Sequence, residues 1–279
     1  MLIHDKLMAL AEKVRRTPFD FEDFAPAVVE SYTSRLEGAQ LLLFESSATR
    51  ALFDIAKSTI RAGIPMETGL VPFDRIYAEI SYPGDENRIA AMVERDAAGL
   101  SVRLLTLRGS GDLLLDAITT RIPLDGPPLA RLDHPEALTD MAASNPKALQ
   151  DRLETSEHLS MHVFQVLFAF AALRREEKVV REEGEPLYSR QQRRRAVREG
   201  RPLPERTVTR IKLGAEGRNH LAAMGDAATA SGKRRAHWVR GHLFVARNGE
   251  LTWRRPHIRG VGEVRNTVRV VECDDVPSP

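Results

Sequence analysis

Apolar residues recur at helical spacing in the first part of the chain, and short turn-forming segments interrupt them. Ser47 stands where it would cap the third helical segment, and Gly63 stands where a left-handed C-terminal cap is expected. The LLLFE run between the second and third segments fits a strand or a helix equally. Helices are therefore predicted over residues 2–16, 25–36 and 48–62.

From Val71 onward the period becomes that of strands. The β-rich runs are separated by YPGDEN, DAAG and GSGD, which are turn compositions, so an antiparallel meander is expected. Residues 159–173 are apolar nearly all round, which is typical of a buried helix. The predicted strands cover residues 75–81, 88–95, 101–107 and 117–122.

The pattern as a whole predicts an α+β fold with a helical and antiparallel-meander body, followed by a basic C-terminal module that contains a β-hairpin. The polar run REEKVVREEGEP reads as a connector, Thr207 to Leu213 as a strand, and the Gly-, Ala- and Ser-rich residues 214–233 as a flexible loop. The expected units are an acidic α+β body (1–175), a basic helix, strand and flexible linker (176–232), and a β-rich basic module (233–279).

Composition narrows the function classes. The only cysteine is Cys273, so no intrachain disulfide or multi-cysteine zinc site can form, and a cytoplasmic location is expected. No apolar run reaches the roughly 18 residues that a membrane span needs. His158 and His162 lie four apart without a third ligand nearby, so packing or capping is expected rather than a metal site. The glycines lack the spacing of a nucleotide fingerprint, so no cofactor is expected.

Charge is distributed unevenly along the chain. Of the 41 lysines and arginines, 24 lie from Leu173 onward against 14 acidic residues, which gives that part a net charge of +10 and leaves −8 for the rest. An anionic partner for the C-terminal part is one explanation. Mutual attraction between the two parts of the fold is the other.

The richest segment is HWVRGHLFVARNGELTWRRPHIRG, residues 237–260. Asn248-Gly249 predicts a hairpin with a two-residue type I′ turn, in which Arg247 faces Glu250. In that register one face is mostly apolar, and it includes Val239, Leu243 and Val245. The opposite face carries Trp238, Arg240, His242, Phe244, Trp253, Arg255, His257 and Arg259.

Like charges across a strand pair are unfavourable, so the second hairpin face is expected to meet an anion. Arginine forks bind phosphate oxygens, exposed aromatic rings stack on bases, and histidine bonds to phosphate near neutral pH. The alternative is that the acidic body covers this face, with its arginines ion-paired and its aromatics packed as core.

A second basic segment, SRQQRRRAVREG, points the same way. As a helix it places Arg190, Arg194 and Arg198 on one side, with Arg193 beside them, and the repulsion among them favours a polyanion. The alternative is that this helix face is simply exposed to solvent and binds nothing. The expected nucleic-acid contacts are therefore Arg190, Arg193, Arg194, Arg198, Trp238, Arg240, His242, Trp253, Arg255, His257 and Arg259.

The order of motifs in the last third of the chain resembles a family of uncharacterised proteins carried by tailed phages, prophages and plasmids. The match runs through the R-x-x-R-R run at Arg190, the Pro202-Leu203-Pro204 segment, the H-x-V-R-G-H motif at 237–242 and the P-H-x-R-G motif at 256–260. The resemblance implies a mobile-element origin and no particular activity.

Three functions compete on these residues. The first is a nucleic-acid-binding accessory or regulatory protein of a mobile element, with recognition dominated by backbone phosphates, because no helix-turn-helix or zinc module is evident. The second is a metal-independent ribonuclease-like enzyme in which His242 and His257 act as base and acid, helped by Arg240 and Arg255. The third is a protein that inhibits a host factor by binding it directly.

Overall fold

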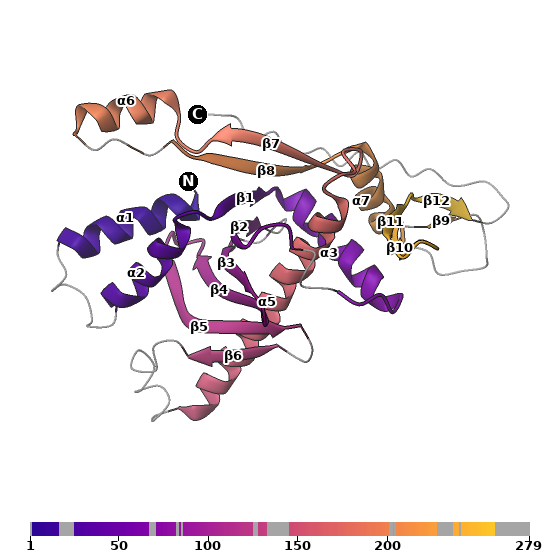
Figure 1. The fold of residues 1–279 in the computed structure, drawn as a ribbon, viewed down its shortest axis with the longest axis horizontal. Coiled ribbons are helices and arrows are strands. Elements are labelled where there is room, and N and C mark those ends of the chain that lie inside the picture. The colour runs from indigo at the N-terminus through magenta and orange to yellow at the C-terminus, as the bar shows by residue number, and fades with distance from the viewer. Residues whose placement is uncertain are drawn as a thin grey trace.

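The computed structural model describes residues 2–16, 25–66, 71–81, 84, 86–124, 128–132, 145–200, 203, 205–227, 237–239 and 241–259. These residues form the predicted α+β fold, in which a large mixed sheet carries helices on both faces (Figure 1).

The large sheet has the strand order β6-β5-β4-β3-β2-β1-β8-β7. Strands β2 to β6 pair antiparallel in sequence order, which confirms the predicted meander. Strand β1 pairs parallel with both β2 and β8, so the apolar part of the LLLFE run, residues 41–44, belongs to a strand. The bounds are β1 (Gln40–Phe44), β2 (Arg75–Ser81), β3 (Arg88–Asp96), β4 (Gly99–Leu107), β5 (Leu113–Pro123), β6 (Leu129–Leu132), β7 (Val180–Pro186) and β8 (Thr207–Leu213).

Strand β1 lies between two hydrophobic cores, which explains its unbroken apolar sequence. Leu42 and Phe44 point into the core beneath helices α3 (Ser46–Arg61) and α5 (Pro146–Leu173). Leu41 and Leu43 point the other way, toward helices α1 (Ile3–Arg16) and α2 (Ala25–Leu36). Because successive strand residues face opposite sides, one short run serves both cores.

The helix predictions hold well, with one error at a cap. Helices α1, α2 and α3 match the expected segments, and the apolar run 159–173 forms the buried C-terminal half of α5. Gly63 has the predicted left-handed conformation, with φ of 74°. The cap at Ser47 was wrong, because α3 begins at Ser46, and Glu45 stands at the N-cap without a side-chain cap hydrogen bond.

Two segments of the last third are more regular than predicted. The expected polar connector is the edge strand β7, whose Glu183 and Glu185 pair with Lys212 and Arg210 of β8. A polar sequence makes a good edge strand because its charged side chains stay in solvent and discourage pairing with other chains. Strands β7 and β8 extend the sheet of the body across the expected boundary near residue 175.

The expected flexible loop contains helix α7 (Ala215–Ala227). Its Gly217 is required by packing, since a Cβ there would overlap the carbonyl oxygen of Val179. Gly214 and Gly217 were thus read as flexibility, although at each of them a Cβ would overlap a backbone carbonyl oxygen.

The C-terminal strands are β9 (His237–Val239), β10 (His242–Val245), β11 (Leu251–Arg254) and β12 (His257–Arg259). Strand β10 pairs with β11 and β12 with β9, so the hairpin exists, but its register differs by one residue from the prediction. Ala246, rather than Arg247, pairs with Glu250 across the turn, with 2.8 Å between the Ala246 nitrogen and the Glu250 oxygen. The loop has three residues and ends at Gly249 with φ of 82°.

Candidate nucleic-acid interface

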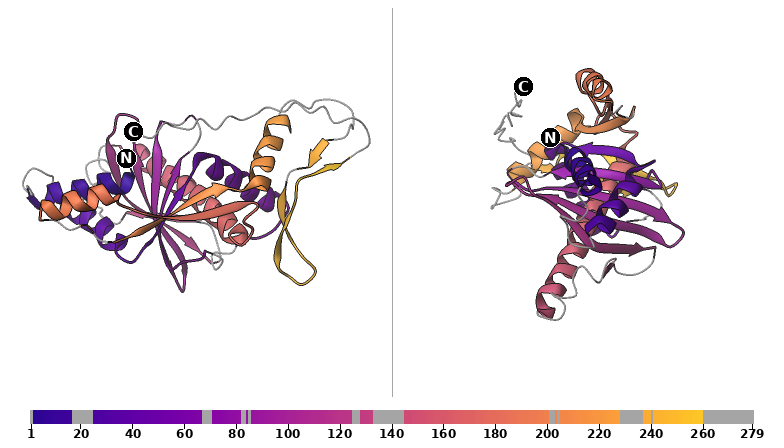
Figure 2. Two further views of the ribbon diagram at one scale, coloured as in Figure 1. Left: turned by 90° about the horizontal axis from the view of Figure 1, so that it is seen from above. Right: turned by 90° about the vertical axis from the view of Figure 1, so that its left-hand side faces the viewer.

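Helix α6 (Arg190–Arg198) carries the main basic surface that the structure describes. Ser189 and Gln192 form a capping box, in which the serine hydroxyl accepts from the Gln192 amide and the Gln192 side chain accepts from the Ser189 amide. The helix lies between β7 and β8 in the chain and stands out at one end of the molecule (Figures 1 and 2). Local capping therefore fixes a helix that has little core contact of its own.

The α6 arginine row, defined as Arg190, Arg194 and Arg198, is exposed along one side of this helix. Within the described part of the chain, no ion pair joins any of the three to a carboxylate. Their neighbours differ: Arg195 is 2.7 Å from Glu199, and Arg193 is 3.3 Å from Glu205. Three like charges at intervals of four residues repel one another unless an anion lies across them.

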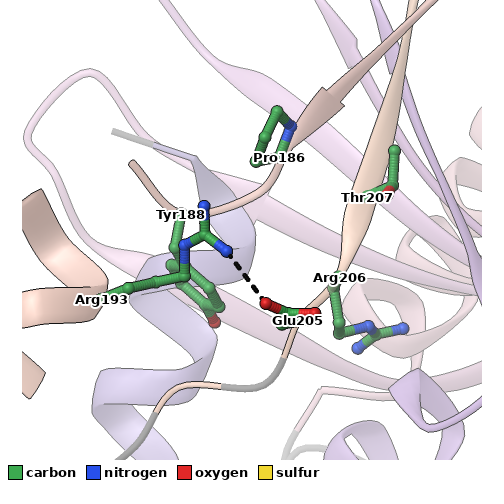
Figure 3. A pocket seen from close by; sticks show the side chains of 6 residues that line it. All are labelled: Pro186, Tyr188, Arg193, Glu205, Arg206 and Thr207. Atoms are coloured by element: carbon green, nitrogen blue, oxygen red, sulfur yellow. Dashed lines mark hydrogen bonds and ion pairs between the residues drawn. The ribbon is translucent and has the colours of Figure 1, made fainter. Parts of the chain in front are cut away.

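Two cavities lie beside α6. The arginine cavity, of about 690 Å³, is lined by Arg190, Arg193, Arg194, Val197, Arg198, Leu203 and Glu205. The Tyr188 cavity, of about 320 Å³, is lined by Pro186, Tyr188, Arg193, Glu205, Arg206 and Thr207 (Figure 3). Arg193 and Glu205 line both, so the two cavities meet at this ion pair.

The walls of the Tyr188 cavity are anchored to the body of the protein. The Arg206 guanidinium donates to the carbonyl oxygens of Leu36 and Ala39 at 2.8 and 3.1 Å. The Tyr188 ring lies edge-on to buried His4, with 6.3 Å between ring centroids. Burial, together with the nearby Asp5 carboxylate, raises the pKa of Tyr188, so its hydroxyl is protonated at neutral pH.

Among the described residues of the C-terminal hairpin, Trp253 does not lie on the predicted binding face. In the observed register Trp253 lies opposite Leu243, and both are buried against the core that α3 and α5 cover. Trp253 packs edge-on to the buried His220 of α7, with 5.8 Å between ring centroids. For this residue the alternative of a packed interior is correct, because a slip of one residue moves a side chain to the other face.

The other hairpin residues are distributed around the module. Arg255 forms an ion pair of 3.0 Å with Glu216 of α7, and the ring nitrogen of His257 lies 3.3 Å from the Arg255 carbonyl oxygen. His242 is paired with Arg254, whose guanidinium lies over the Phe244 ring. Arg240 and the side chains of Trp238 and Arg259 lie outside the described residues.

His242 and His257 were expected to flank one phosphate. In the structure His242 lies in β10 opposite Arg254, whereas His257 lies in β12 opposite Val239, so the two histidines belong to different two-stranded sheets. The register from which an acid–base pair was inferred is therefore not observed, and the pair itself stays a prediction.

His158 and His162 are in contact on α5, with ring centroids 4.3 Å apart. Burial, and then the charges of His158 and Lys57, lower the pKa of His162 to about 4. No group of three metal-ligating side chains occurs among the described residues. The pair serves packing here, since the His162 ring also lies 4.4 Å from that of Phe53.

Sequence reasoning identified the basic residues of α6 but missed the cavity beside them. Tyr188 and Arg206 acquire their surroundings from α1 and α2, far away in the sequence. The only local signal was the aromatic residue that directly precedes the helix cap.

The chain was compared with protein-family models, curated proteins and solved structures. A family model described as "AcrVA2-like: Anti-CRISPR type V subtype A2 family" matches residues 47–243, which run from α3 to β10 and include all of α6. No curated protein and no solved structure matches the chain. None of the helices in the described part is long and apolar enough to cross a membrane.

Proposed function

Because the chain belongs to the AcrVA2-like family of type V anti-CRISPR proteins, we propose that it inhibits a type V CRISPR defence and binds nucleic acid through helix α6 in doing so. Membership makes it an accessory protein of a phage or another mobile element that acts against host defence. The partner of such a protein is a host protein or complex. The proposal adds that α6 contacts the nucleic acid of that partner.

The observation that carries this proposal is the α6 arginine row. Successive members are four residues apart, which at about 1.5 Å per residue separates them by about 6 Å along the helix axis. A row of this kind can follow a phosphate backbone, where each guanidinium binds phosphate oxygens through its planar fork. The expected recognition is of backbone rather than base edges, because no element of the described chain has the form of a groove-reading module.

The first experiment compares three proteins for binding to a 12-nucleotide RNA and a 12-nucleotide DNA over a salt series. The test variant is Arg190→Gln/Arg194→Gln/Arg198→Gln. The control is Arg50→Gln/Arg61→Gln/Arg175→Gln, which removes the same charge from exposed arginines elsewhere. On a single strand each lost phosphate contact reduces the salt slope by about 0.7, so the test variant should lose about 2 from the slope of log K against log salt.

The control variant should retain the slope of the natural protein. The same three proteins are then compared for protection of an infecting phage in cells that carry a type V CRISPR system. Equal slopes and equal protection for the test variant and the natural protein would contradict the proposal.

A further inference from the structure

We propose that the Tyr188 cavity takes one unstacked base with its phosphate, so that the preferred ligand is single-stranded nucleic acid. This inference rests on the proposed function and deepens it, since α6 alone would bind any polyanion. The cavity lies where the arginine cavity ends, at the pair formed by Arg193 and Glu205. A strand that follows α6 would reach it without leaving the basic surface.

The chemistry of the walls fits a nucleotide. Figure 3 shows Arg193 and Tyr188 on one side of the cavity and Arg206 and Thr207 on the other. The tyrosine offers a ring for stacking, and the arginines offer donors for a phosphate. A volume of about 320 Å³ is at the lower end of ligand cavities, which suits one nucleotide better than several.

The cavity is also held in place before any ligand arrives. The neighbouring Leu187 packs against the core beneath α1 and α2, and the Tyr188 ring lies against buried His4. Arg206 is fixed by two backbone carbonyls and, in the described part of the chain, is ion-paired with no carboxylate. A rigid ring and a fixed cation lose little conformational entropy on binding.

Among the described residues that line the cavity, Glu205 is the one that opposes an anion. Its side chain is 89% exposed, and its ion pair with Arg193 is 3.3 Å long, so the pair contributes little stability. A phosphate at Arg193 would displace this carboxylate. Removing the carboxylate should therefore strengthen binding of a nucleotide at this position.

Base insertion requires an unstacked base, because the bases of a duplex are paired and stacked inside it. A peptide with acidic and aromatic side chains is the other occupant whose chemistry matches arginines beside a tyrosine ring. The nucleotide is favoured by continuity with the α6 arginine row, whose regular spacing suits a repeating phosphate. The peptide becomes an outcome of the test.

The experiment measures affinity for a 12-nucleotide single-stranded RNA, the matching 12-base-pair duplex and a 12-residue acidic peptide containing tyrosine. Tyr188→Leu should weaken single-strand binding about tenfold or more, as expected for one lost stacking contact, and leave duplex binding within about twofold. Tyr188→Phe keeps the ring and should bind the single strand within about threefold of the natural protein. Thermal unfolding of each variant checks that the fold is retained.

Glu205→Gln gives a second test at an exposed position that the fold does not depend on. It should strengthen single-strand binding at least threefold, and by more than Glu199→Gln, which removes an equal charge from the other end of α6. Equal gains for both variants, on both nucleic acids, would indicate general electrostatics and overturn the cavity site.

The two proposals fail in different ways. If the natural protein binds both nucleic acids equally, with a salt slope that depends on the α6 arginine row and with no effect of Tyr188→Leu, the cavity is wrong and the proposed function stands. If it binds the peptide and neither nucleic acid, the cavity proposal and the proposed nucleic-acid contact of α6 are both wrong.

Discussion

The contact between Gly241 and Trp253 provides the sharpest test of how the C-terminal hairpin packs. A Cβ atom at position 241 would overlap two atoms of the Trp253 ring, much closer than unbonded atoms approach. Gly241→Ala should therefore force the ring out of its site and lower the free energy of unfolding by about 1–3 kcal/mol, the usual cost of overpacking. Trp253→Leu should lower it by roughly 2–4 kcal/mol, because the large buried ring leaves a cavity.

The double variant decides the question. Once the ring is gone, the added methyl group of Gly241→Ala loses its two overlaps and keeps only a 3.1 Å approach to the Cδ of Pro256, so the two losses should be less than additive by about 1–3 kcal/mol. Gly249→Ala is the control from the same hairpin: its φ of 82° makes an alanine strained, yet a Cβ there meets no atom within 4 Å. Its effect should add to that of Trp253→Leu within about 0.5 kcal/mol.

Urea unfolding followed by far-ultraviolet circular dichroism measures all of these variants without relying on the fluorescence of Trp253. In the register predicted from the sequence, Trp253 lies opposite Phe244 and on the other face from Gly241. Additivity of Gly241→Ala and Trp253→Leu within about 0.5 kcal/mol would favour that register and refute the packing described above.

Two further predictions concern polar groups in the body of the protein, one of them buried and the other half-buried. Glu79 is buried and accepts from the Tyr77 hydroxyl and the Arg88 guanidinium, so Arg88→Met should cost roughly 1.5–3 kcal/mol in urea unfolding, and adding Glu79→Gln should recover part of it. His162 has a folded-state pKa of about 4 against 6.5 when unfolded, so the unfolded chain binds the proton more readily and stability should fall as pH drops from about 6.5 toward 4. His162→Gln should flatten this dependence of Tm on pH; an unchanged pH profile would show that another group causes it.

The body of the fold was predictable because its signals are local. A helix with one apolar face and a strand with alternating residues can each be recognised from the residue pattern of a short segment. Turn-forming residues separate the strands β2 to β5. Strand β1 was ambiguous because it is buried on both faces, and such a strand looks the same as a buried helix segment in periodicity. The ambiguity is resolved by the length of the strand and by the strands that pair with it, and only the folded structure shows these.

The errors of the last third share a cause in contacts that the sequence does not display. Strand β7 is polar because the sheet ends there, and α7 contains glycine because Val179 passes close to it. The hairpin turn was found, but its length was misjudged by one residue, since Asn-Gly suits a two-residue turn and Gly249 also closes a three-residue one. That single step places Trp253 on the opposite face of the β10–β11 pair from His242 and Phe244.

Only the part of the candidate site that depends on charge and helical spacing was predictable from the sequence. The α6 arginine row follows from counting residues along a helix. The Tyr188 cavity does not follow from the sequence, because Arg206 donates to the carbonyl oxygens of Leu36 and Ala39, which are distant from it along the chain. Its ring and cation are brought together by the antiparallel pairing of β7 with β8, where Pro186 lies opposite Thr207 and the Leu187 amide donates to the Arg206 carbonyl oxygen.

Ion pairing, rather than net charge, separates the binding surface from the rest of the basic third. Arg210 and Lys212 are neutralised by Glu185 and Glu183 across β7 and β8, and Arg255 is neutralised by Glu216. These cations hold elements together and are poorly placed to bind a ligand, since a phosphate would first have to displace a carboxylate that the fold already provides. The same reasoning ranks the basic residues of α6: the unpaired row should contribute most to affinity, Arg193 next because its pair is long and exposed, and Arg195 least because Glu199 hydrogen-bonds to it and raises its pKa.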